Sequence, residues 1–188
     1  MKSFDLNITN LKKCYYLCDY LPINKYTQDQ KSKLILDFKD HKSSAVSHWC
    51  LEASKACGST LAYTNIDVIV RVLGHDELEV GKQDLPLDKL GRDISKEINA
   101  NYQPKILSKS NTNKSLKFLS KEGRKKELEH KYNFKSSGFI RNLSILIIDD
   151  ITTTGSTINE VCRAITAQVP FANIYFFSLG KTKEKKSF

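Results

Sequence analysis

The sequence predicts an α/β fold with a mainly parallel central sheet flanked by helices, a flexible loop and a small hood region. Runs rich in β-branched residues, typical of buried strands, occur at residues 66–73 and 143–148. The segments 87–100 and 158–167 instead have apolar residues at helical spacing. This alternation of strands and helices is typical of α/β domains whose sheet is mainly parallel.

The first part of the chain changes from an irregular to a helical pattern. Residues 1–26 are rich in Tyr and Lys, and we expect an irregular segment there. Short helices are predicted at 32–39 and 44–57 because their apolar residues lie on one helical face. Gly58 is a suitable stop for the second helix.

The central part contains a strand, a helix and a long polar segment. The strand at 66–73 is broken by the residues 74–77, and Pro86 suits the first turn of the next helix. A short strand is predicted at 104–107. The basic segment 108–137 is long for a compact domain, and loops of this length are usually functional or disordered.

A strand, two acids and a polar loop follow one another within thirteen residues. Ile145–Ile148 is an apolar run, Asp149 and Asp150 lie at its predicted end, and the loop after them is Thr153, Thr154, Gly155, Ser156 and Thr157. The loop opens onto the helix predicted at 158–167, and the N–H groups at a helix start favour a phosphate. Ionised carboxylates accept hydrogen bonds from sugar hydroxyls and also hold Mg²⁺. The simpler alternative is an ordinary strand, a polar turn and a helix cap.

The loops 74–82 and 153–157 both follow predicted strands of one parallel sheet. Ligands of such sheets bind at the carboxyl ends of the strands. We therefore expect both loops at the same edge of the sheet. A last strand is predicted at 173–179.

Composition indicates one soluble domain. The chain has 188 residues, 40% of them hydrophobic, which is enough for a sizeable core. It has no apolar run of about eighteen residues and no apolar signal core at its start, so we expect a cytoplasmic protein without a membrane span.

The five cysteines are odd in number, which argues against a disulfide framework. Cys14 and Cys18 have a spacing found in zinc sites, but a structural site needs four ligands. We favour buried or idle thiols.

Positive charge is concentrated in one segment. The formal net charge is +9, and residues 105–135 contain ten Lys and Arg against three Glu. Such a segment steers a polyanionic small molecule, binds nucleic acid phosphates, or is a solvated loop.

The order of residues from 145 to 157 resembles the signature of type I phosphoribosyltransferases, and further segments are similar to the ComF-like branch of that family. Those segments are Leu34–Lys39, Leu107–Lys109, Leu119–Arg124 and Asn133–Phe134. The resemblance implies a domain at 27–180 that binds 5-phosphoribosyl 1-pyrophosphate (PRPP). Residues 1–26 would be a hood or a reduced zinc module, and 181–188 a basic tail.

The resemblance also implies roles for single residues. Asp149 and Asp150 would bind the ribose and hold Mg²⁺ directly or through water, and residues 153–157 would bind the 5-phosphate. Gly74, His75 and Lys82 would form the pyrophosphate loop. Lys109 and Arg124 would join the acids as catalytic residues on a lid.

The chain departs from the family pattern after its first core strand. The usual prolines and arginine are missing there, and Lys82 offers a point charge in place of a guanidinium fork. The sequence therefore supports two functions. One is a Mg²⁺-dependent transferase that releases pyrophosphate from PRPP. The other is a non-catalytic module that senses PRPP or a nucleotide and binds nucleic acid or a protein partner through residues 105–135, in a competence- or defence-type role.

Overall fold

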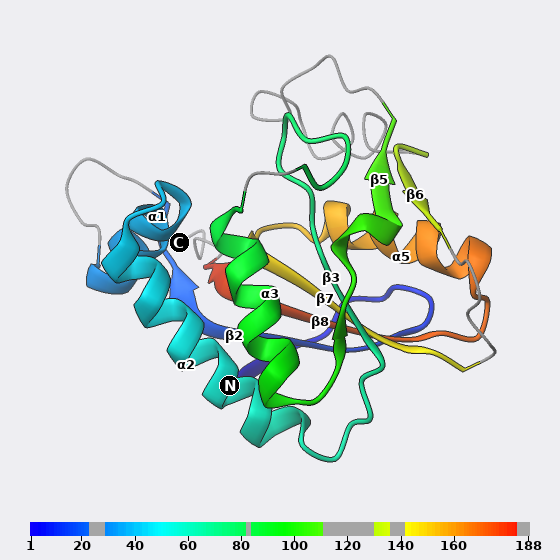
Figure 1. The fold of residues 1–188 in the computed structure, drawn as a ribbon, viewed down its shortest axis with the longest axis horizontal. Helices are drawn as coiled ribbons and strands as arrows, with labels where there is room; N and C mark the ends of the chain where they lie inside the picture. The colour runs from blue at the N-terminus through cyan, green and yellow to red at the C-terminus, as the bar shows by residue number, and fades with distance from the viewer. Residues whose placement is uncertain (23–28, 82–83, 111–129, 136–141, 184–188) are drawn as a thin grey trace, which may run out of the picture.

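The fold is built on a six-stranded sheet, shown by a computed structural model that describes residues 1–22, 29–81, 84–110, 130–135 and 142–183. The strand order is β1-β2-β8-β7-β3-β4, and only β1 is antiparallel to its neighbour. The predicted α/β class with a mainly parallel sheet is confirmed (Figure 1). The strands are β1 (Lys2–Phe4), β2 (Leu11–Tyr20), β3 (Val68–Arg71), β4 (Asn101–Tyr102), β7 (Ser144–Thr152) and β8 (Asn173–Thr182).

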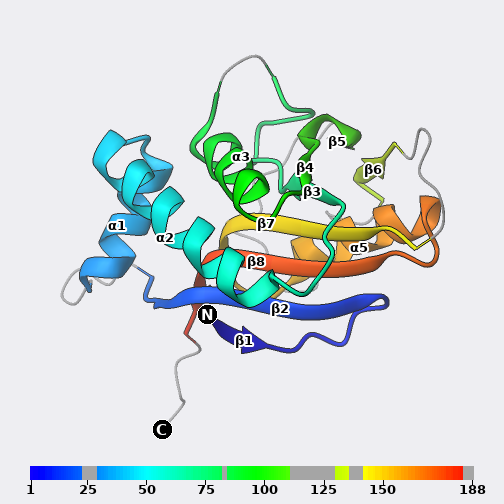
Figure 2. The same ribbon diagram turned by 60° about the horizontal axis from the view of Figure 1, so that its bottom comes forward.

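Helices cover both faces of this sheet. In the view of Figure 1, α2 (Ser43–Leu61) and α3 (Pro86–Glu97) lie in front of the sheet, and α5 (Ser156–Gln168) lies behind it. The helix α1 (Gln30–Lys39) packs beside α2, as the turned view in Figure 2 also shows. A 3-10 turn, η1 (Pro104–Ile106), leads to a small antiparallel pair of strands, β5 (Leu107–Lys109) and β6 (Tyr132–Phe134).

The strand β7 divides the core into two layers. Ile145 and Ile147 pack in the layer of α5, β5 and β6, whereas Leu146 and Ile148 pack in the layer of α1, α2 and α3. Successive side chains of a strand point to opposite faces, so a strand buried on both faces is apolar throughout. This explains the unbroken apolar run that the sequence shows before the acids.

The prediction that residues 1–26 are irregular is wrong for most of that segment. Its residues 2–4 and 11–20 are strands, and β2 pairs in parallel with β8 over almost its full length. Tyr-rich segments favour strands, but β2 lies near the edge of the sheet and lacks a regular alternation of apolar and polar residues. Its pairing with a strand from the far end of the chain carried no local signal. The domain boundaries at 26 and 180 stay predictions.

Two predicted element ends and one predicted strand are also wrong. The helix α2 continues past Gly58 to Leu61. Gly58 lies where α2 packs closely on α3, since an added Cβ there would be 2.7 Å from an oxygen of Glu97. The strand β7 continues through both acids to Thr152, since its pairing with β8 extends that far. The segment 104–107 is mainly the turn η1.

The cysteines and the helices bear on two further expectations. All five thiols are free and buried, as expected, and Cys14 and Cys18 pack in different layers of the core. Burial raises the pKa of Cys14 to about 12 and that of Cys18 to about 11. In the described parts of the chain, every helix is too short or too polar to cross a bilayer.

Gly91 sets how closely α3 approaches Tyr102. An added Cβ would lie 2.7 Å from the ring carbon Cδ2 of Tyr102. Overpacking of this kind destabilises a protein by about 1–3 kcal/mol, whereas replacing a helical glycine with alanine stabilises the helix by about 1 kcal/mol. We expect Gly91→Ala to lower the free energy of unfolding by about 1 kcal/mol in urea denaturation.

Gly81→Ala is the matched control, because an added Cβ there meets no atom within 4 Å. We expect that variant to stay within about 0.5 kcal/mol of the wild type. A Gly91→Ala protein as stable as the control would show that α3 and Tyr102 are not tightly packed.

Candidate functional site

The predicted acids lie at the edge of the sheet where the parallel strands end. Ile148 is the partner of Arg71 in the register of β7 and β3, so Asp149 and Asp150 lie beside the chain that leaves β3. The loop 153–157 leaves β7 at this edge, and the loop that begins at Gly74 leaves β3 there. The expectation that both loops lie at one edge of the sheet is confirmed.

Asp149 and Asp150 point to opposite faces of β7 because the strand continues through both of them. Asp150 faces α1, where its Oδ2 atom lies 3.2 Å from Nζ of Lys39. Asp149 lies on the side of β5 and β6, and its charge acts on Lys109 and Tyr132. Both carboxylates also accept backbone hydrogen bonds, Asp149 from the N–H of Asp150 at 2.8 Å and Asp150 from that of Ile151 at 2.6 Å.

The negative charges of Asp149 and Asp150 are not fully balanced by nearby positive charge. Burial and then the negative charge of Asp150 raise the pKa of Asp149 well above its usual value. Burial disfavours the charged form of Lys39, but its pairing with Asp150 outweighs burial and raises the pKa of Lys39. A bound cation would relieve the repulsion between the two carboxylates.

Carboxylate oxygens are the ligands that Mg²⁺ prefers, so the acid pair fits the predicted metal in its chemistry. No cluster of three or more His, Cys, Asp or Glu side chains able to hold a metal occurs in the described part of the chain. That pattern agrees with the usual way Mg²⁺ binds, through one or two carboxylates together with substrate phosphates and water.

The loop after β7 ends in a glycine that starts α5. Gly155 is the cap of α5 and has a φ of 77°, in the left-handed region that glycine adopts without strain. It offers no side chain to the first turn, so the N–H groups there receive no side-chain cap. Thr153 and Thr154 are exposed, and the hydroxyls of Thr154 and Ser156 lie 2.9 Å apart. Ser156 and Thr157 form the first turn itself, so hydroxyl and backbone donors converge here as predicted for an anion site.

The N-terminal segment closes this loop from one side. An added Cβ on Gly155 would lie 2.7 Å from Cδ1 of Leu6, so Leu6 and the loop are in close contact. A cleft of about 630 Å³ beside α5 is lined by Leu6, Asn7, Ile8, Thr9, Thr154, Gly155, Ser156, Asn159, Glu160, Cys162, Arg163 and Thr166. Nothing in the sequence indicated that residues 6–9 line this cleft.

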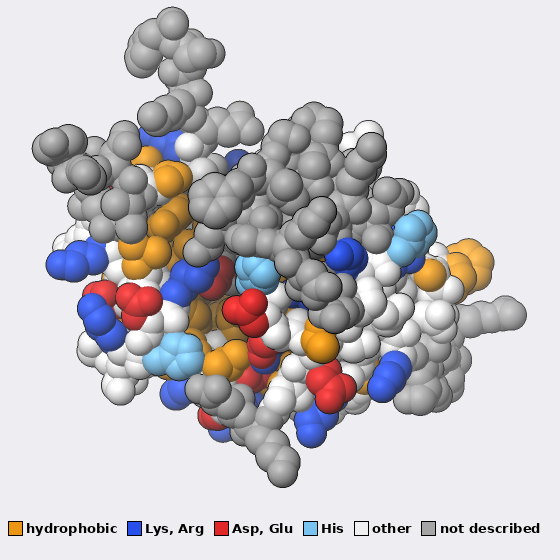
Figure 3. All heavy atoms as spheres, turned by 90° about the horizontal axis from the view of Figure 1, so that it is seen from above, with side chains coloured by type: hydrophobic (Ala, Val, Ile, Leu, Met, Phe, Trp, Pro, Cys, Tyr) orange, Lys and Arg blue, Asp and Glu red, His pale blue; other side chains and the backbone are white. Residues whose placement is uncertain are grey.

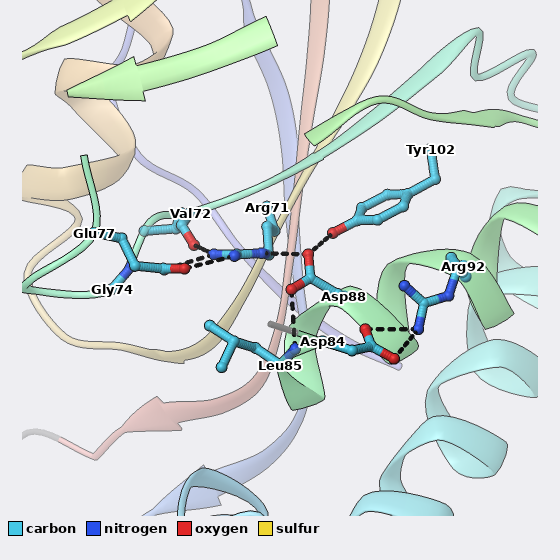
Figure 4. A network of polar contacts seen from close by, with 9 residues as sticks. All are labelled: Arg71, Val72, Gly74, Glu77, Asp84, Leu85, Asp88, Arg92 and Tyr102. Atoms are coloured by element: carbon cyan, nitrogen blue, oxygen red, sulfur yellow. Dashed lines mark hydrogen bonds and ion pairs between the residues drawn. The ribbon is translucent and has the colours of Figure 1, made fainter. Parts of the chain in front are cut away.

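The loop after β3 is fixed by a buried arginine. Arg71 is only 1% exposed, and its guanidinium group binds Glu77 through two hydrogen bonds of 2.7 Å and Asp88 of α3 through one of 2.6 Å (Figure 4). Asp88 also accepts a hydrogen bond from the hydroxyl of Tyr102 at 2.7 Å. Glu77 in turn accepts a hydrogen bond from the N–H of Gly74 at 2.6 Å. The loop 74–77 is therefore tied to β3, α3 and β4.

Lys109 connects β5 to the same loop. Its ammonium group donates a hydrogen bond to the carbonyl of Gly74 and lies 5.4 Å from the centre of the Tyr132 ring. Burial lowers the pKa of Lys109 to about 8, although the charges of Glu77 and Asp149 act in the opposite direction. His75 is exposed, and its Nδ1 lies 3.3 Å from a carboxylate oxygen of Asp76.

The two small strands are held against the chain after β3 and against α5. The hydroxyl of Tyr132 donates to the carbonyl of Leu73 at 3.4 Å, on the side of β3. Arg163 of α5 donates to the carbonyl of Tyr132 at 2.9 Å and pairs with Glu160. The base of the predicted lid therefore contacts the chain after β3 and the helix α5 (Figure 1).

The outcome for the predicted site residues is mixed. Gly74, His75, Lys109, the two acids and the loop 153–157 are described and lie at one edge of the sheet. Lys82 and Arg124 lie outside the described residues, as does most of the basic segment 105–135.

Sequence reasoning left out two charged groups of the site. Lys39 was noticed only as part of the segment 34–39, and its position at the end of α1 places it on Asp150. Arg71 lies between Val70 and Val72 in the apolar part of the predicted strand 66–73. A charge in such a strand needs a buried partner, and that signal was available in the sequence.

Comparison with known proteins gives likenesses of structure alone. No family model matches the chain, and no curated protein matches its sequence. Adenine phosphoribosyltransferase from Saccharomyces cerevisiae is 14% identical, with 75% of this chain and 72% of that one covered and a TM-score of 0.46. A hypoxanthine phosphoribosyltransferase from Staphylococcus aureus is 16% identical, with 72% and 73% covered and a TM-score of 0.44.

A third similar structure, the hypoxanthine phosphoribosyltransferase of Trypanosoma cruzi, is 14% identical and has a TM-score of 0.45. The match covers 89% of this chain and 77% of that chain. Likenesses with TM-scores below 0.5 do not assign a family, and none of them is specific to the ComF-like branch. The argument for function therefore depends on the site itself.

Lys109 should be the most reactive lysine near neutral pH. With a pKa of about 8, half of its amine is neutral at pH 8, whereas less than about 1% of an ordinary lysine is neutral there. We expect its acetylation rate, followed by mass spectrometry from pH 6 to 10, to rise with a midpoint near pH 8. The other lysine peptides of the same digest are the control, and a Lys109 midpoint above pH 10 would contradict the burial of its amine.

Proposed function

We propose that the chain is a phosphoribosyltransferase-like protein that binds PRPP at the carboxyl edge of its sheet. The observation that carries the proposal is the acid pair Asp149 and Asp150 directly before a glycine-started helix. This order provides acceptors for two sugar hydroxyls and donors for a phosphate within one short segment. A ribose 5-phosphate has those two groups at its two ends.

The proposed reaction is transfer of the phosphoribosyl group. The C1–O bond to pyrophosphate breaks with its electron pair on the leaving oxygen, and a nitrogen of the acceptor forms the new bond to C1 and gives up a proton. Positive charge develops on the ribose ring, as in glycosyl transfer generally. In this proposal the carboxylates of Asp149 and Asp150 stabilise that charge and accept hydrogen bonds from the ribose hydroxyls.

Other groups of the chain support this chemistry. The first turn of α5 and the hydroxyls of the loop 153–157 would fix the 5-phosphate, and Lys109 would provide positive charge on the other side of Asp149. When Mg²⁺ is bound at Asp149 and Asp150, directly or through water, it neutralises charge on the pyrophosphate. The cytoplasmic location and the placement in the ComF-like branch belong to the proposal and depend on the sequence alone.

A second candidate is a module that binds the same ligand without turning it over. One observation favours it: the N–H of Gly74, in the predicted pyrophosphate loop, is already hydrogen-bonded to Glu77. Such a module would report the ligand to a nucleic acid or protein partner through the basic residues 105–135. Release of pyrophosphate from PRPP with any acceptor base or amine favours the transferase. Nucleic acid binding that weakens steeply with salt favours the module.

Thermal unfolding tests the binding of PRPP. Ligand at one hundred times its dissociation constant stabilises a protein by about 2.7 kcal/mol, which raises the Tm of a chain of this size by roughly 5–10 °C. We expect PRPP with Mg²⁺ to shift the Tm of the wild type by this amount. The double variant Asp149→Asn/Asp150→Asn should lose the shift, because amides neither hold Mg²⁺ as carboxylates do nor accept as strongly from hydroxyls.

Asp5→Asn/Asp19→Asn is the matched control. It removes the same charge from two aspartates outside the acid pair, which form ion pairs with Lys13 and Lys2. The control should keep the full shift. If millimolar PRPP does not raise the Tm of the wild type, the assignment of PRPP as the ligand is wrong. If the double variant shows the same Tm shift as the control, the acid pair does not bind PRPP.

A further inference from the structure

The carboxylate of Glu77 occupies a position that is built to hold an anion. Its Oε1 atom accepts from Arg71 at 2.7 Å, and its Oε2 atom accepts from Arg71 at 2.7 Å and from the N–H of Gly74 at 2.6 Å. A guanidinium fork together with a backbone N–H is a common way to bind a carboxylate or a phosphate. Figure 4 shows Glu77 lying along the guanidinium group, with Gly74 beside it.

Burial does not neutralise the carboxylate of Glu77. It disfavours the ionised form of Glu77, but the hydrogen bonds from Arg71 and Gly74 outweigh burial and lower the pKa of Glu77. Glu77 is therefore an anion at neutral pH. The third and fourth contacts of Arg71, with Asp88 and the carbonyl of Val72, leave its guanidinium group no free edge for a second anion.

The position of Glu77 relative to Asp149 and Asp150 determines which part of a bound ligand would compete with its carboxylate. The charges of Glu77 and Asp149 both act on Lys109 and Tyr132, so both carboxylates lie near these two side chains. In the proposed binding mode the phosphate lies on α5 and the ribose at Asp149, and the other end of the ligand would point to the loop 74–77, which leaves the same edge of the sheet. A charged group on C1 of the ribose would meet that loop.

Further negative charge lies on the same loop. Asp76 is 99% exposed and Glu79 is exposed, and both line a cleft with Gly74, His75 and Lys109. Figure 3, viewed from the side of β5 and β6, shows acidic, basic and histidine side chains close together on this face. A diphosphate arriving here meets acids, and its best donors in the described residues are already engaged.

We propose that Glu77 is an internal anion that fills the diphosphate position, so that the site binds the ribose 5-phosphate part of its ligand and gains little from a 1-diphosphate. This inference rests on the proposed function, since it assumes that the acid pair and α5 hold a ribose 5-phosphate. It adds a specificity-determining residue to that site. The ligand class that suits the resting protein is a 5-phosphorylated ribose without a diphosphate on C1.

Calorimetric titration of the wild type with ribose 5-phosphate and with PRPP, both with Mg²⁺, is the first test. We expect the two dissociation constants to lie within about threefold of each other, which is less than one charged hydrogen bond contributes. This measurement needs no variant and therefore does not depend on whether a variant folds.

Glu77→Gln is the second test. The amide has the size of the carboxylate and keeps one oxygen for Arg71, but it has no charge and holds the N–H of Gly74 less strongly. We expect the affinity for PRPP to rise by about tenfold, the gain of one charged hydrogen bond, and that for ribose 5-phosphate to stay within about twofold. The Tm without ligand shows whether the variant is folded.

Asp76→Asn is the matched control, because it removes the same charge from the same loop without a contact to Arg71 or Gly74. It should change the ratio of the two affinities by less than about twofold, because the charge of the fully exposed Asp76 is screened by water and salt. Wild-type PRPP binding ten times tighter than ribose 5-phosphate overturns the inference alone, as does an equal effect of Glu77→Gln and Asp76→Asn. A wild type that binds neither ligand overturns the proposed function and this inference with it.

Discussion

The site depends on the guanidinium group of Arg71, which lies inside the protein and holds two carboxylates. Moving a charged guanidinium group from water into the protein interior costs several kcal/mol, and this cost is offset only when the group is fully paired. Glu77 and Asp88 are those partners, and they come from the loop after β3 and from the first turn of α3. Removing Arg71 would leave both carboxylates without their cation, and an uncompensated buried charge costs about 3–5 kcal/mol. The loop 74–77 therefore has one well-defined conformation.

The acid pair obeys a different constraint, the alternation of side chains along β7. Because the strand does not end at Ile148, the two carboxylates face different layers and have different neighbours. Asp150 has the ammonium group of Lys39, whereas Asp149 lies close to Lys109 and the buried Tyr132. One carboxylate is thus compensated and the other is not. This asymmetry arises from a strand only a few residues longer than the sequence pattern indicates.

Much of the core could be predicted from the sequence, because both β7 and the helix after it have strong local patterns. The apolar run before Asp149 and the position of Gly155 before α5 are features of adjacent residues, so the sequence shows them directly. The strand β2 and the contact of Leu6 with Gly155 were missed because they join residues from opposite ends of the chain. The pairing of Arg71 with Glu77 and Asp88 was missed for a related reason: the carboxylates are near in sequence, but nothing in their pattern distinguishes them from surface acids.

The pairing of β2 with β8 has a consequence for when the protein acquires its site. Leu11 is paired with Ile174, so the strand that carries the N-terminal segment into place finds its partner only after residue 174 has been synthesised. Contacts between residues so distant in sequence form late, since a large loop must close first. During translation the emerging chain could assemble β3, α3 and the buried arginine early. The loop at Gly155 would meet Leu6 only once β8 has left the ribosome, which makes the part of the site beside Gly155 the last to be completed.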